Sequence, residues 1–216
     1  MHSPKVPGAK ICGIATPETL DAAVSGGASH VGFVFFPPSP RAVGFERAAQ
    51  LAARTPPHVR RVGVFVNPED ALLDQAVAAG RVDAIQLHAT AADRVAAIGR
   101  RQGVEVWAAV PIKTRADLDA ARQYPGAADR IVYDAKTPPG APLPGGMGVR
   151  FDWTLLDGFA HPLPWLLSGG LDAGNVGAAI SRTGATLVDV SSGVEIAPGI
   201  KDAGLIASFL GAVAAA

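Results

Sequence analysis

The residues of this sequence that could carry acid–base chemistry are a single cysteine and an aspartate. Cys12 lies in the segment KICG, two residues after Lys10. In an extended strand, residues two apart point to the same side, so the Lys10 ammonium should lie beside the Cys12 thiol. A nearby cation raises the fraction of thiolate, which makes Cys12 a candidate general base. The alternative is that Cys12 is a small, buried hydrophobic residue.

Asp134, in the segment YDAK, is the candidate general acid. By alternation, Val132, Asp134 and Lys136 should share one face of a strand, opposite Ile131 and Tyr133. A carboxyl group that is buried on such a face has a raised pKa, because desolvation disfavours its charged form, and it can then donate a proton. The alternative is a structural ion pair between Asp134 and Lys136.

Two small-residue segments could bind an anion: SGG (168–170) and SSG (191–193). Small residues let backbone N–H groups approach a phosphate closely. Glycine pairs also serve plain tight turns, but the two segments follow two successive apolar runs, and we therefore predict a phosphate site. Its predicted residues are Gly169, Gly170, Ser192 and Gly193.

Two further residues could contact a substrate. Arg41 ends the segment FPPSPR and can bind a carboxylate through two parallel hydrogen bonds, although a surface ion pair is the alternative. His88 ends the segment QLH and could contact substrate or hydrogen-bond a backbone carbonyl. The other four histidines show no metal-ligand spacing, so we predict neither a metal nor a cofactor.

Composition narrows the class of protein. The chain has 216 residues, of which 49% are hydrophobic and 18% charged, with 19 basic and 19 acidic residues. Zero net charge indicates no nucleic-acid or membrane partner. One cysteine cannot form an intrachain disulfide, and residues 1–13 lack the apolar stretch of a signal peptide, so we expect a cytoplasmic protein. The apolar segment 204–216 is too short to span a bilayer and predicts a closing helix.

Eight short apolar runs alternate with amphipathic segments and must position these residues. Three segments carry helix-start signals: Thr16-Pro17 and Asn67-Pro68 each offer an N-cap oxygen followed by proline, and Thr114 stands three residues before Asp117. The apolar runs are AKICGI (from 9), HVGFVFF (from 30), RVGVFVN (from 61), VDAIQLH (from 82), GVEVWAAV (from 103), DRIVYDA (from 129), PLPWLLSGG (from 162) and ATLVDVSSG (from 185).

Strand–helix alternation repeated eight times predicts an α/β fold with a parallel sheet closed into a (β/α)8 TIM barrel. We expect residues 1–216 to form one such catalytic domain. An open, doubly wound sheet is the alternative, but no GxGxxG follows the first run. In a (β/α)8 barrel the active site lies where the strands end, and the residues singled out above follow or end predicted strands.

Taken together, these strand ends resemble the phosphoribosylanthranilate isomerases of tryptophan biosynthesis. The resemblance runs from about residue 9 to the last helix, and KICG with DVSSGVE is specific as a pair. Ala89 stands where that family commonly has glycine. The matching segments are KICGI (10–14), VGFVFFPPSPR (31–41), VGVFVN (62–67), QLH (86–88), DAKTP (134–138), FDW (151–153), LLSGGL (166–171), VDVSSGVE (188–195) and PG-x-KD (198–202).

The resemblance implies an Amadori rearrangement of N-(5-phospho-β-D-ribosyl)anthranilate to 1-(2-carboxyphenylamino)-1-deoxyribulose 5-phosphate. Asp134 would protonate the ribose ring oxygen, and the Cys12 thiolate would then remove the proton from C2. Arg41 would hold the anthranilate carboxylate, and backbone amides of the two small-residue segments would hold the phosphate. Lys10 and His88 are expected beside the same phosphosugar. We expect the segment from Lys136 to Arg150 to form a mobile lid, and the assembly to be a monomer or homodimer.

The same residues disfavour three rival functions. The related sugar isomerase of histidine biosynthesis needs an aspartate where this chain has Cys12, and a triosephosphate-type isomerase needs a strand-end glutamate. A barrel that only binds phosphorylated metabolites would have no reason to retain both Cys12 and Asp134. An acid–base isomerase is therefore the prediction.

Overall fold

The computed structural model describes residues 7–138, 140 and 145–216, and each of the eight apolar runs contributes one strand. All neighbouring strands run parallel, and β1 pairs with β8, so the sheet closes on itself. The strands are β1 (Gly8–Cys12), β2 (His30–Val34), β3 (Arg60–Val66), β4 (Ala84–His88), β5 (Glu105–Ile112), β6 (Arg130–Ala135), β7 (Trp165–Leu167) and β8 (Leu187–Val190). This is the predicted (β/α)8 barrel.

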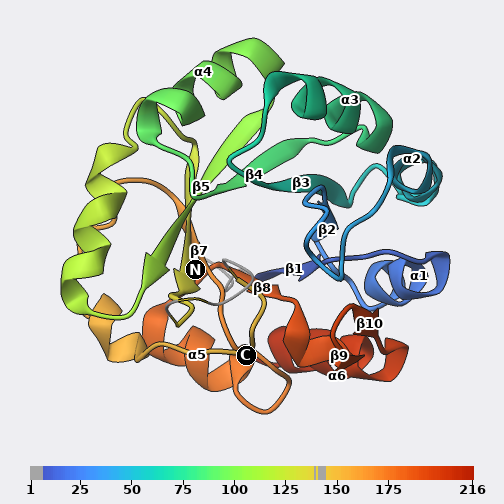
Figure 1. Ribbon diagram of the computed structural model, residues 1–216. Coiled ribbons are helices and arrows are strands. Elements are labelled where there is room, and N and C mark those ends of the chain that lie inside the picture. The colour runs from blue at the N-terminus through green and yellow to red at the C-terminus, as the bar shows by residue number, and fades with distance from the viewer. Residues whose placement is uncertain (1–6, 139, 141–144) are drawn as a thin grey trace.

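Helices surround the barrel and cover the outer face of its strands (Figure 1). The α-helices are α1 (Pro17–Ser25), α2 (Phe45–Arg54), α3 (Asp70–Gly80), α4 (Ala92–Gln102), α5 (Val176–Thr183) and α6 (Ala203–Ala214). Two 3-10 segments, η1 (Arg115–Gln123) and η2 (Trp153–Leu156), stand between strands, and a third, η3 (Ser192–Val194), follows β8. A two-stranded hairpin of β9 (Glu195–Ala197) and β10 (Ile200–Lys201) precedes α6, which is the predicted closing helix.

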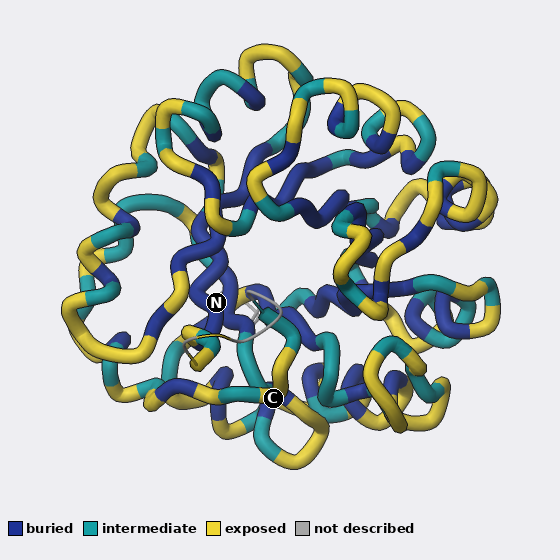
Figure 2. The backbone as a smooth tube through the Cα atoms, in the orientation of Figure 1, coloured by how far each residue is buried: buried dark blue, intermediate teal, exposed yellow. Residues whose placement is uncertain are grey.

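Alternation along the strands separates two apolar layers. Residues such as Ile131 and Tyr133 point outward and pack against the helices, whereas Val132 points into the barrel with Trp107 and Leu166. The ring of strands is therefore buried on both faces, as the burial colours show in Figure 2. No helix among the described residues is long and apolar enough to cross a membrane.

Two of the three predicted helix-start signals are confirmed, and one is wrong. Thr16 caps α1 through its side chain, and Thr114 with Asp117 forms a capping box, although the segment that follows is a 3-10 helix. The prediction of Asn67 as an N-cap is wrong, because Glu69 occupies that position. Asn67 instead adopts a left-handed conformation (φ 38°) and its N–H donates to the His88 carbonyl at 3.0 Å, which makes it a strand-end turn residue.

Candidate active site

A cavity opens at the carboxyl ends of the strands, the end at which (β/α)8 barrels hold their active sites. Its volume is about 820 Å³ including the open mouth. Seven of the nine predicted site residues line it: Cys12, Arg41, His88, Asp134, Gly169, Gly170 and Ser192. The other two are placed differently, since Lys10 is fully buried and Gly193 packs against the backbone of Leu171.

Cys12 and Lys10 share the inner face of β1, as alternation predicts. Both side chains have room because Gly32 is their neighbour on β2, in register with Cys12. A Cβ on Gly32 would lie 3.1 Å from Cys12 Sγ and 3.2 Å from Lys10 Cε, closer than side chains normally pack. Lys10 Nζ donates to Asp189 Oδ1 at 2.9 Å, which places a buried ion pair beside the thiol.

The pKa of Cys12 is raised above its ordinary value, because burial of the thiol outweighs the opposing charge of Lys10. The negative charge of Asp189 raises that pKa further, and the charge of Lys201 lowers it. This differs from the expectation that the ammonium would dominate. The physical reason is burial of the thiol, which is the largest effect, while the Lys10–Asp189 pair places an opposing negative charge nearby and keeps the pKa of Lys10 raised against burial.

Asp134 lies on the inner face at the end of β6, with 6% of its surface exposed. Burial, and then the negative charge of Asp189, raise its pKa to about 7. The alternative of an Asp134–Lys136 ion pair is not observed, because Lys136 Nζ bonds Asp117 Oδ1 at 3.2 Å. Asp134 Oδ1 instead accepts from the Ala135 N–H at 2.9 Å. A carboxyl group with this pKa can donate a proton near neutral pH.

Backbone donors follow β7 and β8, and those of Gly169, Gly170 and Ser192 lie at the cavity. Within the described parts of the chain, the N–H groups of Gly169, Gly170, Ser192 and Gly193 donate to no other protein group. Gly169 and Gly170 have φ values of 94° and 61°, in the left-handed region that glycine adopts without strain. Neighbouring amides without internal partners form a concavity suited to an anion.

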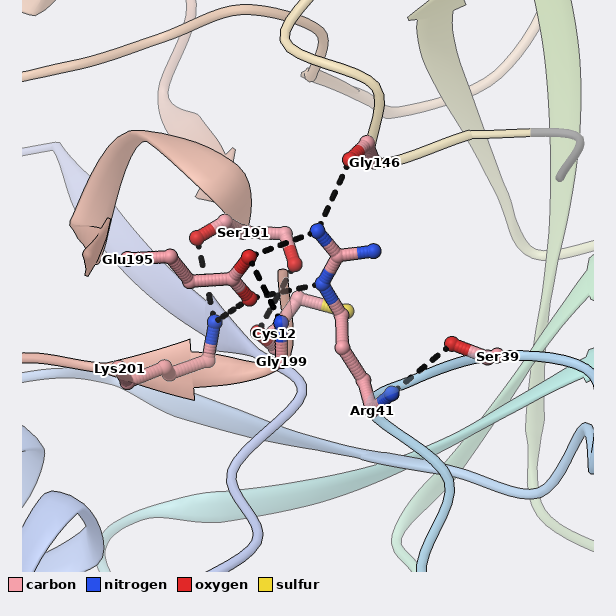
Figure 3. Close-up of polar contacts among 8 residues, drawn as sticks. All are labelled: Cys12, Ser39, Arg41, Gly146, Ser191, Glu195, Gly199 and Lys201. Carbon is pink, nitrogen blue, oxygen red and sulfur yellow. Dashed lines mark hydrogen bonds and ion pairs between the residues drawn. The ribbon is translucent and has the colours of Figure 1, made fainter. Parts of the chain in front are cut away.

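Arg41 lies on the wall of the cavity with 5% of its surface exposed. Its guanidinium donates through Nε and Nη2 to the two oxygens of Glu195, at 2.7 and 2.8 Å, so the ion pair is buried rather than superficial (Figure 3). Nη2 also donates to the Gly146 carbonyl at 2.9 Å. Gly146 belongs to the predicted lid segment 136–150, of which residues 139 and 141–144 lie outside the described residues.

His88 bonds a side chain rather than the backbone carbonyl that was the alternative. Its Nε2 lies 2.9 Å from Nε2 of Gln86, and burial together with the charge of Lys10 lowers its pKa to about 4. His88 is therefore neutral at physiological pH. In the described structure, Gln86 Oε1 is buried without a hydrogen-bond partner and Gln86 lines the cavity. The described residues bring together no group of three or more His, Cys, Asp or Glu side chains that could hold a metal.

A family model decides between the alternative functions. Residues 9–212 match the model of N-(5'-phosphoribosyl)anthranilate isomerase. The chain belongs to this family. Curated members of the phosphoribosylanthranilate isomerase family agree over nearly the full length. The enzyme of Zymomonas mobilis subsp. pomaceae is 57% identical over 94% of this chain and 96% of its own, and that of Rhodospirillum centenum is 53% identical over 95% and 97%.

Solved structures of the phosphoribosylanthranilate isomerase family share the fold. The enzyme of Thermotoga maritima superposes with a TM-score of 0.87 at 36% identity, over 97% of this chain and all of that chain. Another solved structure, of a phosphoribosylanthranilate isomerase in complex with reduced 1-(o-carboxyphenylamino)-1-deoxyribulose 5-phosphate, superposes with a TM-score of 0.82 at 34% identity, over the same shares. The predictions of the family, of the barrel and of an isomerase of tryptophan biosynthesis are confirmed.

No function was predicted for three charged residues of the site, although each lies in a segment that resembles the phosphoribosylanthranilate isomerases. Asp189 pairs with Lys10 across the β1–β8 closure, while Glu195 and Lys201 form an ion pair at 3.0 Å beside Arg41. Asp189 left one signal, since a carboxylate inside the apolar run LVDV must be paired or used. Glu195 and Lys201 lie in the β9–β10 hairpin, and no pattern in the sequence indicates their role.

Proposed function

We propose that this chain isomerises N-(5'-phosphoribosyl)anthranilate to 1-(2-carboxyphenylamino)-1-deoxyribulose 5-phosphate, with Asp134 as general acid and Cys12 as general base. The observation that carries the proposal is the buried Asp134 carboxyl group, whose pKa of about 7 lies at the pH where an acid catalyst works best. Cys12 lines the same cavity and carries the only thiol of the chain.

The acid step opens the sugar ring. Protonated Asp134 transfers its proton to the ribose ring oxygen, the C1–O bond breaks, and the nitrogen lone pair forms a protonated imine. The carboxylate that remains is stabilised by the Ala135 N–H, which already donates to Oδ1 at 2.9 Å. General acid catalysis of this kind contributes roughly a hundred- to ten-thousand-fold to the rate.

The base step moves a proton from carbon. The Cys12 thiolate removes the proton from C2, and the electron pair of that C–H bond forms the enolamine as the imine is neutralised. When the enolamine tautomerises to the ketone, Cys12 loses the proton that it took and Asp134 regains the proton that it gave. No external reactant is therefore consumed. Burial raises the pKa of Cys12, and the Lys10 and Lys201 ammonium groups are the two charges that favour its thiolate.

Both anionic ends of the substrate have matching donors. The free amides of Gly169, Gly170, Ser192 and Gly193 would hold the phosphate, and Arg41 would hold the anthranilate carboxylate. Lys10, buried beneath the sugar, would favour the thiolate form of Cys12. Neutral His88, at the end of β4, would contact the substrate. Fixing both ends aligns C2 and the ring oxygen with the two catalytic groups, and such alignment contributes several kcal/mol to catalysis, on the order of 7 or more in the best cases.

The proposed partners are small. The substrate is a phosphosugar, and the protein acts in the cytoplasm, where a thiol stays reduced. A solved Thermotoga maritima enzyme of this family is described as dimeric, and for this chain a monomer and a homodimer are both compatible with a cavity that one barrel lines. Sedimentation of the purified chain distinguishes these two states.

A single assay tests the proposal. Freshly prepared phosphoribosylanthranilate loses its anthranilate fluorescence as it is converted, and we expect turnover by wild type. Cys12→Ser and Asp134→Asn should each lower kcat/KM by at least about a hundredfold, or about 3 kcal/mol of barrier. Asp21→Asn, which breaks an exposed ion pair between α1 and Arg54 of α2, is the matched control, because neither residue lines the cavity. Activity retained in Cys12→Ser would remove the thiolate mechanism.

A further inference from the structure

A carboxylate that the catalytic steps do not use stands at the centre of a buried charge cluster (Figure 3). Glu195 accepts hydrogen bonds from Arg41 Nε at 2.7 Å, Arg41 Nη2 at 2.8 Å, Lys201 Nζ at 3.0 Å and the Gly199 N–H at 3.2 Å. The side chains of the three charged residues are each at most 6% exposed. The hydrogen bonds of Arg41 and Lys201 keep the pKa of Glu195 lowered although burial alone would raise it.

The cluster carries more positive than negative charge. Arg41 and Lys201 contribute two cations, and Glu195 contributes one anion. An unbalanced charge removed from water is costly unless an opposite charge compensates it. The cluster borders the cavity through Arg41, so the compensating anion can arrive from the cavity side.

The geometry of Arg41 leaves one part of its guanidinium available. Nε and Nη2 are occupied by Glu195 and by the Gly146 carbonyl, while Nη1 donates to no described group and points away from Glu195 in Figure 3. The side-chain stem packs closely over Gly13, where a Cβ would lie only 2.9 Å from Arg41 Cδ. Arg41 is therefore held in one orientation from two sides.

We propose that Glu195 is a positioning residue that fixes the Arg41 guanidinium for the anthranilate carboxylate, while Lys201 keeps the cluster cationic. The proposal rests on the carboxylate-binding role of Arg41 given above. A long, flexible arginine loses side-chain entropy when it binds a ligand, and an arginine already fixed by a carboxylate has less to lose. Lys201 is needed because an isolated Glu195–Arg41 pair would be neutral and would attract a second carboxylate weakly.

Glu195→Gln separates positioning from simple electrostatics, because the two predict opposite signs. Removing a negative charge raises the net positive charge of the cluster, so electrostatics alone predicts a lower KM for the anionic substrate. Positioning predicts a higher KM, by about tenfold or more, since one of the two hydrogen bonds from the guanidinium is lost and the other is no longer made to a charged acceptor. We expect this rise with kcat changed by less than about threefold, because the interaction concerns binding rather than the reacting atoms.

Further variants test whether Glu195→Gln changes KM through Arg41. Glu195→Gln combined with Arg41→Met should raise KM no more than Arg41→Met alone, because residues that act as a unit are not additive. With N-(5-phosphoribosyl)aniline, which lacks the carboxylate, Glu195→Gln should leave KM unchanged when product is followed by chromatography. Glu195→Asp keeps the charge but shortens the reach, and its KM should lie between those of wild type and Glu195→Gln. Asp21→Asn again serves as the control for loss of an Asp–Arg pair.

The outcomes distinguish this inference from the proposed function. If Arg41→Met leaves KM unchanged, Arg41 does not bind the carboxylate and the proposed substrate pose is wrong. If Arg41→Met raises KM while Glu195→Gln lowers it or leaves it unchanged, the pose stands and the positioning role of Glu195 is overturned. An equal rise of KM for the substrate and for its carboxylate-free analogue would also overturn it, because that result indicates general structural damage.

Discussion

Asp134→Asn should abolish most activity and at the same time stabilise the protein at alkaline pH. The pKa of Asp134 is raised from 3.8 to about 7 by burial and by Asp189, so ionisation of this group disfavours the folded state. In the unfolded chain the carboxyl loses its proton near pH 4, and the folded state retains that proton until about pH 7. The stability of wild type therefore falls between about pH 4 and pH 7 through this one group, and a shift of this size corresponds to about 4 kcal/mol.

Asparagine has nearly the same shape and never ionises. The difference in free energy of unfolding, Asp134→Asn minus wild type, should be near zero at pH 4 and should increase to about 4 kcal/mol at pH 8. Urea denaturation followed by circular dichroism at pH 4, 5, 6, 7 and 8 measures it, and comparing two proteins at each pH cancels the other titrations. Asp83→Asn is the control, because hydrogen bonds from Arg61 lower the pKa of Asp83 despite burial, so this group is ionised in both states above about pH 4 and its difference should stay nearly constant from pH 4 to pH 8. A difference for Asp134→Asn that stays constant from pH 4 to pH 8 would refute the burial argument.

Two further predictions concern Gly32 and Cys12, which are neighbours inside the barrel. Gly32→Ala should destabilise the protein by about 1–3 kcal/mol and lower kcat/KM, because its Cβ would press on Cys12 and Lys10. Thermal unfolding and steady-state kinetics measure both effects. Gly177→Ala on α5, whose Cβ would meet open space, is the control and should be neutral or slightly stabilising in the same measurements. Alkylation of the single thiol by iodoacetamide should accelerate with a midpoint above the ordinary cysteine pKa, and a midpoint below it would contradict the dominance of burial over Lys10.

Local patterning predicted the strands and the direction of the side chains that do the proposed chemistry. The apolar runs located all eight strands within a few residues, because strands buried on both faces are continuously hydrophobic. Alternation placed Lys10 with Cys12, and Val132 with Asp134, on the inner face. Ala89 adopts φ 49°, a left-handed conformation that glycine adopts without strain and that a residue with a Cβ rarely adopts.

Properties that depend on contacts between distant segments could not be predicted. Lys10 meets Asp189, 179 residues later, only because the last strand pairs with the first. Arg41 meets Glu195 across 154 residues, and no periodicity specifies how the loop after β2 and the β9–β10 hairpin come together. The raised pKa of Cys12 follows first from burial of the thiol in the closed barrel, and the further effects of Asp189 and Lys201 on that pKa depend on these distant contacts. A strand pattern reports which face a residue occupies, but not the charges that it will meet there.

A crystal structure of this chain with reduced 1-(o-carboxyphenylamino)-1-deoxyribulose 5-phosphate tests the central claim most directly. The proposed mechanism predicts Cys12 Sγ at about 3–3.5 Å from C2 of the ligand, the separation of atoms about to react. It also predicts an Asp134 oxygen at about 2.6–3.2 Å from the oxygen at C4, which is the ring oxygen of the substrate. A ligand bound in the cavity with either group more than about 5 Å from its reacting atom, and with no water between them, would contradict the assignment of base and acid.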